Sequence, residues 1–92
     1  MSTPQEVSFS DLVLMLATMA AVHFGEMPDP VTGEARKNLP VAGQMIDLLT
    51  VLQQKTRNNL DAEETQLLET LLYELRLRFI DASKDEPRII TP

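Results

Sequence analysis

The chain has 92 residues, of which 43% are hydrophobic and 4% aromatic, and it contains no cysteine. Eight basic against fourteen acidic residues give a net charge of -6, which disfavours direct binding to nucleic acid or to an anionic membrane surface. A disulfide framework and a thiol nucleophile are excluded, and a reducing cytoplasmic compartment is expected. The length suits one small domain, and apolar content dominated by aliphatic residues favours an all-α fold.

The pattern predicts three helices, at about residues 8–24, 39–57 and 61–82, in a single helical domain over residues 8–82. Residues 1–7 are expected to form a flexible N-terminus and residues 83–92 a flexible C-terminal tail. A long Pro/Gly-containing linker separates the first two helices. The predicted fold class is therefore an all-α three-helix protein whose copies form an intermolecular helical bundle.

The first predicted helix begins at a capping box, in which Ser8 is the cap and Asp11 stands three residues later. Gly25 is the expected stop. Apolar residues surround nearly the whole circumference, so we expect this helix to be buried on most sides. The apolar run is shorter than the roughly 20 residues that a bilayer needs. It also lacks the basic flank of a signal peptide, because the first basic residue is Arg36.

The linker, residues 25–37, holds a stiff Pro28-Asp29-Pro30 segment and a predicted turn at residues 31–34. Thirteen residues without regular structure are many for a small domain, so the linker is either a recognition loop or a spacer. The only histidine, His23, precedes it, with Glu26 and Asp29 close in sequence. These three are weak candidates for a metal or acid–base site, since one histidine with loop carboxylates is more often a helix-end histidine.

The second predicted helix starts at Asn38, with Pro40 in its first turn, and ends near Asn58-Asn59. Its predicted buried stripe is Val41, Met45, Leu48, Leu49 and Leu52. The basic segment at residues 55–59 could hold a phosphate, but helix-end charges followed by a turn are the simpler interpretation.

The third predicted helix starts at a second capping box, Asp61 with Glu64. One stripe at helical spacing consists of Leu68, Leu71, Leu72, Leu75 and Phe79. A second stripe, Tyr73, Leu77 and Ile80, lies on roughly the opposite side of the helix. The C-terminal half of this helix is therefore apolar on two faces.

Three helices cannot bury all of this apolar surface within one chain. Each buried aliphatic side chain is worth roughly 1.5–3 kcal/mol, so the surplus favours association. We expect a homodimer or a larger even oligomer, because twofold closure is the commonest. The predicted interface consists of Leu12, Met15, Leu16, Met19, Tyr73, Leu77 and Ile80.

No set of residues in the sequence indicates catalysis, a cofactor or a resident metal. The leading hypothesis is a non-enzymatic, self-associating helical interaction or structural module, with itself and an unidentified protein as partners. The alternative is a small-ligand or metal-binding protein that uses the region of His23, Glu26 and Asp29. A peripheral membrane protein that inserts its first helix is a third hypothesis, and the missing basic flank argues against it.

From Ala20 to Ile80 the chain resembles a bacterial family of uncharacterised proteins, domain-of-unknown-function family 1844. The resemblance rests on the segments HFGEMPDP (23–30), TGE (32–34), NL (38–39), IDLL (46–49), KTRNNL (55–60) and LLYELR (71–76). The family pattern has glycine where Asn58 stands. The resemblance implies a helical protein of the bacterial cytoplasm and brings no catalytic residue.

Overall fold

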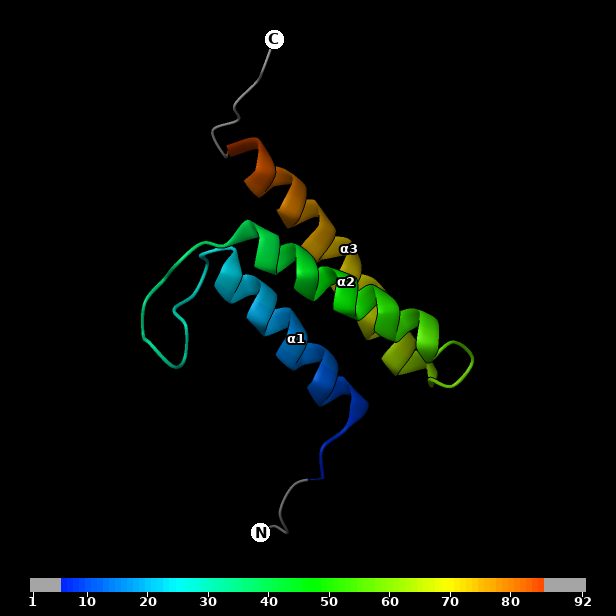
Figure 1. The fold of residues 1–92 in the computed structure, drawn as a ribbon. Helices are drawn as coiled ribbons and strands as arrows, with labels where there is room; N and C mark the ends of the chain where they lie inside the picture. Colours follow the sequence, from blue (N-terminus) through cyan, green and yellow to red (C-terminus); the bar gives the residue numbers. More distant parts are fainter. Residues whose placement is uncertain (1–5, 86–92) are drawn as a thin grey trace.

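The computed structural model describes residues 6–85, and these contain three α-helices: α1 (Phe9–His23), α2 (Leu39–Lys55) and α3 (Ala62–Asp85). Consecutive helices run antiparallel, and each of the three contacts both of the others (Figure 1). Within the described residues there is no strand. The predicted all-α, three-helix fold class is confirmed.

The helix starts are set by local side-chain bonds. Ser8 Oγ accepts from Asp11 N at 3.1 Å, while Asp11 Oδ2 accepts from Ser8 N at 3.0 Å. Asp61 and Glu64 form the same reciprocal pair, at 2.8 and 3.0 Å. Asn38 Oδ1 accepts from the backbone N–H of Val41 at 3.2 Å. These bonds satisfy amide donors that have no partner inside a helix.

The helix ends depend on residues that adopt a left-handed backbone. Gly25 follows α1 with φ 81°, a conformation that lacks a steric cost only in glycine. Asn58 lies in the turn after α2 with φ 69°. Glycine adopts this backbone readily, which explains the glycine that the family pattern has at this position. The expected end of the third helix was wrong: α3 continues through Asp85, beyond residue 82. The sequence expectations for residues 1–5 and 86–92 lie outside the described residues.

The core is a single aliphatic cluster between the three helices. It comprises Val13, Ala17, Ala20, Phe24, Leu39, Ala42, Ile46, Leu49, Leu68, Leu72 and Leu75. The predicted stripe of the third helix is confirmed, whereas that of the second is partly wrong because α2 buries Ala42 and Ile46 and leaves Leu48 exposed. Within this chain α1 is not buried on most sides, because Leu12, Leu14, Met15 and Met19 are exposed.

Candidate functional site

The side of α1 away from the core carries an exposed apolar face. Leu12, Met15 and Met19 are 36%, 55% and 40% exposed, and their spacing of three and four residues places them on one side of the helix. Leu16, the fourth predicted interface residue of this helix, is only partly exposed because it packs against the core. We call Leu12, Met15 and Met19 the α1 face.

A second exposed apolar face lies on the C-terminal half of α3. Tyr73, Leu77 and Ile80 are 66%, 45% and 51% exposed, so the opposite side of the helix supplies the core contacts. These three residues form the α3 face. In the described part of the chain, six of the seven predicted interface residues are therefore exposed.

A hollow of about 500 Å³ lies between α2 and α3, beside the α3 face. Its lining includes Gly43 and Asp47 from α2 and Arg76, Phe79 and Ile80 from α3. The glycine permits this close approach, because a Cβ added at Gly43 would stand 3.2 Å from Phe79 Cε1. Sequence reasoning did not assign Gly43 or Asp47 to a site; a glycine inside a helical pattern was the available signal.

Two arginines of α3 bind other elements from opposite sides of the helix. Arg76 donates from Nη2 to Thr50 Oγ1 of α2 at 2.8 Å. Arg78 donates from Nη1 to Glu26 Oε1 of the linker at 3.1 Å, and both side chains of this ion pair are about half exposed. The two bonds hold α3 to α2 and to the linker, with the modest strength of exposed polar contacts.

The linker has an ordered turn built around Asp29. Its Oδ1 accepts from the backbone N–H groups of Val31 and Thr32 at 2.7 and 3.3 Å, and Gly33 N donates to the carbonyl oxygen of Asp29 at 2.7 Å. Asn38 N also donates to the carbonyl oxygen of His23 at 2.7 Å. This bond joins the residues on either side of the linker. The carboxylate of Asp29 thus serves local turn bonds.

The three weak metal candidates do not form a metal centre. His23 and Asp29 line a polar hollow of about 380 Å³ together with Thr32, Glu34 and Arg36, while Glu26 is paired with Arg78. Among residues 6–85 no group of three or more His, Cys, Asp or Glu side chains is arranged to hold a metal ion. The linker folds back on itself at the Asp29 turn and does not run extended throughout.

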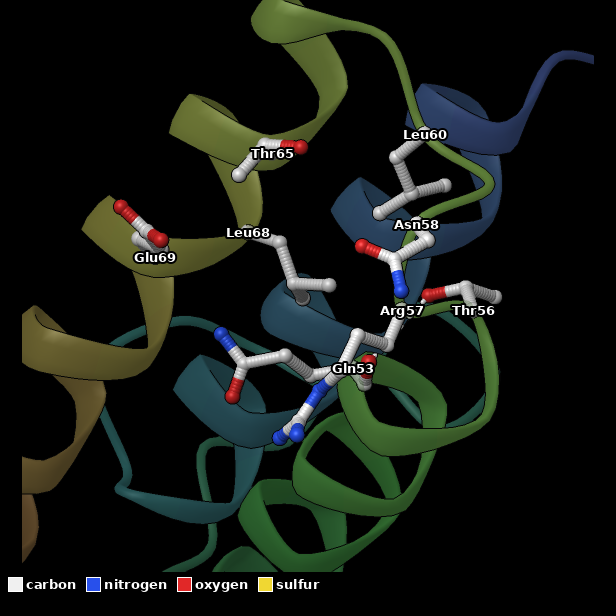
Figure 2. Close-up of a pocket in the computed structure, with 8 residues that line it drawn as sticks. All are labelled: Gln53, Thr56, Arg57, Asn58, Leu60, Thr65, Leu68 and Glu69. Carbon is white, nitrogen blue, oxygen red and sulfur yellow. Dashed lines mark hydrogen bonds between the residues drawn. The ribbon is translucent and has the colours of Figure 1, made fainter.

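A second polar hollow, of about 480 Å³, lies at the turn between α2 and α3 (Figure 2). Gln53, Thr56 and Arg57 come from the end of α2 and the residues just after it, and Thr65, Leu68 and Glu69 come from α3. The hydroxyl of Thr56 donates to the carbonyl oxygen of Leu52 at 2.7 Å. The basic corner singled out in the sequence therefore also includes an acidic side chain, Glu69, which makes it a mixed-charge surface.

The fold and its exposed faces define a class: a small three-helix protein with more apolar surface than its own core covers. No helix of the described region is long and apolar enough to cross a membrane.

Residues 6–81 match the family described as a domain of unknown function, DUF1844, and the chain belongs to that family. No curated protein and no solved structure matches the chain.

Proposed function

We propose that this protein is a non-enzymatic, self-associating helical module of the bacterial cytoplasm, whose first partner is a second copy of itself. The observation that carries the proposal is the pair of uncovered apolar faces, Leu12, Met15 and Met19 on α1 and Tyr73, Leu77 and Ile80 on α3. The lack of cysteine and the excess of acidic residues agree with a reducing, non-membrane setting.

While the two faces stay in water, their side chains forgo the free energy of burial. Full burial of such a side chain is worth roughly 1.5–3 kcal/mol. Since the six side chains are 36% to 66% exposed, covering the remainder is worth about 1 kcal/mol per residue. The six contributions on each chain are enough to offset much of the entropic cost of association, estimated at about 4–15 kcal/mol.

The composition of the two faces supports an interface as well. Methionine adapts its shape to a partner surface, and tyrosine offers a large apolar ring with a polar tip. Lysine and glutamate, which interfaces tend to exclude, are absent between Leu12 and Met19, and on α3 Glu74 lies on the flank of the trio.

Sedimentation equilibrium at micromolar concentration tests the proposal. We expect the wild-type chain to sediment as a dimer or a larger even assembly, and we expect Met15→Glu and Leu77→Glu to weaken association by at least about tenfold, since each places a charge on an apolar contact. Leu14→Glu is the matched control, because Leu14 is also an exposed leucine of α1 but lies away from the α1 face. A wild-type chain that sediments as a 10.3 kDa monomer overturns the proposal.

A further inference from the structure

We infer that the α3 face pairs with the α3 face of a second copy as a short parallel coiled coil, in which Arg76 of each chain meets Asp81 of the other. This inference rests on the proposed self-association and concerns only the contact that is made through the α3 face, for which it gives the orientation and the register; the α1 face makes a separate contact.

The first observation is a coiled-coil spacing on the uncovered side of α3. The residues Gln66, Thr70, Tyr73, Leu77, Ile80 and Lys84 follow one another at intervals of four, three, four, three and four. This alternation is the heptad period that keeps a seam of side chains facing a neighbouring helix. The apolar trio occupies the centre of the seam, and the lysine at its end can extend its ammonium group into water.

The second observation is that the chain's own helices leave room beside this seam. The contacts of α3 with α2 include Arg76, which donates to Thr50, and Phe79, which lies against Gly43. At about 100° per residue, Arg76 lies about 70° and Phe79 about 125° round α3 from the centre of the trio. A partner helix on the α3 face would therefore stand beside α2 without displacing it.

The third observation is the charge on the two flanks of the seam. Glu74 and Asp81 lie on one flank, and Glu69 and Arg76 lie on the other. In a parallel pair, a residue on the second flank meets the partner residue five positions later on the first flank. Arg76 then meets Asp81 of the partner, and twofold symmetry forms this pair twice. The exposed carboxylate of Asp81 has no hydrogen-bond or ion-pair partner among residues 6–85.

Antiparallel pairing has no such complementarity when it covers the whole trio. A register that sets Tyr73 opposite Leu77 of the partner brings the Arg76 residues of the two copies close together, and likewise their Glu74 residues. A register that sets Leu77 opposite Ile80 brings Glu74 close to Asp81. Both registers place like charges together, which is destabilising.

The parallel arrangement also has one unfavourable pair, and that pair supplies a test. Glu69 meets Glu74 of the partner at the polar start of the seam, where Gln66 and Thr70 replace apolar residues. The variant Glu69→Lys turns this repulsion into attraction, so we expect the dimer Kd to fall by about threefold or more at low salt. In an antiparallel pair residue 69 meets the same flank of the partner helix, which presents Ser83 in the first register and a position beyond residue 85 in the second. An unchanged or raised Kd therefore contradicts the parallel pairing.

Disulfide trapping tests the register directly, because the chain has no cysteine of its own. We expect Tyr73→Cys and Ile80→Cys, each as a single variant of the full chain, to form disulfide-linked dimers under mild oxidation. In a parallel pair both positions meet their own copies within the Cα separation of about 4.4–6.8 Å that a disulfide needs. Each antiparallel register leaves one of the two positions about 15 Å or more from its copy along the helix axis.

The control is Leu14→Cys, an exposed position of α1 away from both faces, which reports random collisions. Efficient trapping at residues 73 and 80 and not at residue 14 supports the inference. Sedimentation of a dimer that traps at only one of the two positions, or at neither, overturns the parallel seam and leaves the proposed self-association standing. A monomer at every concentration overturns both.

Discussion

At the scale of single residues, two glycines of the linker adopt a backbone that other residues avoid. Gly25 has φ 81° and Gly33 has φ 76°. We expect Gly25→Ala and Gly33→Ala each to lower the free energy of unfolding by about 1–2 kcal/mol, the cost of a left-handed backbone in an L-residue. Urea unfolding followed by circular dichroism measures both.

The two positions should respond alike because neither is crowded. A Cβ at Gly25 would lie 3.5 Å from Lys37 Cβ, an ordinary contact, and a Cβ at Gly33 would have no atom within 4 Å. Gly25→Asn is the control, since asparagine accepts this backbone, as Asn58 does at φ 69°, and its loss should be smaller. Equal losses for the Ala and Asn variants would show that the backbone angle is not the cause.

Short-range residue bonds were predictable, and long-range ones were not. Both capping boxes and the Asn38 cap could be predicted from the sequence because each joins residues three positions apart. The bonds from Arg76 to Thr50 and from Arg78 to Glu26 span 26 and 52 positions. They depend on how the helices pack, and the charge of a single arginine does not indicate which residue it will bind.

At the scale of elements, the close packing of α2 on α3 depends on Gly43. We expect Gly43→Leu to lower the free energy of unfolding by about 1–3 kcal/mol, because the new side chain must displace the Phe79 ring or push the helices apart. The position of that ring, 3.2 Å from an added Cβ, is the physical reason. Thermal and urea unfolding measure the loss.

Two controls separate this contact from the general effect of an added leucine on α2. Gln44→Leu adds the same residue at the next, exposed position of α2, and we expect a change within about 0.5 kcal/mol. The double variant Gly43→Leu with Phe79→Ala should be less destabilised than the sum of the two single variants. Additive losses would show that Gly43 and Phe79 do not constrain each other.

For the second helix, the periodicity of apolar residues does not determine which of them are buried. Val41, Met45, Leu48, Leu49 and Leu52 have helical spacing, but the buried positions are Leu39, Ala42, Ile46 and Leu49. The helix is apolar on adjoining sides, so either set satisfies the pattern, and the positions of α1 and α3 decide between them. The stripe at residues 68–79 was predictable because polar residues flank it closely.

At the scale of the whole molecule, the three helices pack around one core, and the rest of their apolar surface faces outward. The buried cluster draws on one side of each helix, while the α1 face and the α3 face remain exposed. A surplus of apolar surface was predictable from the sequence, because it follows from composition and helix count. The polar hollow at the linker was not predictable, since it depends on the turn around Asp29 and on the bond that joins Asn38 to His23.

If association covers these faces, folding and assembly are thermodynamically linked, and thermal stability must depend on protein concentration. For a dimer that unfolds to monomers, a hundredfold rise in concentration adds about 2.7 kcal/mol per dimer. Shared between two chains, this raises Tm by roughly 5–10 °C for a domain of this size. Calorimetry at 5 to 500 micromolar, roughly the range that gives this hundredfold change, measures the shift. The variant Leu77→Glu should show a Tm that is lower and nearly constant with concentration, whereas Leu14→Glu should keep the wild-type slope. A constant wild-type Tm would mean that the exposed faces do not contribute to the stability of the folded chain through a second copy.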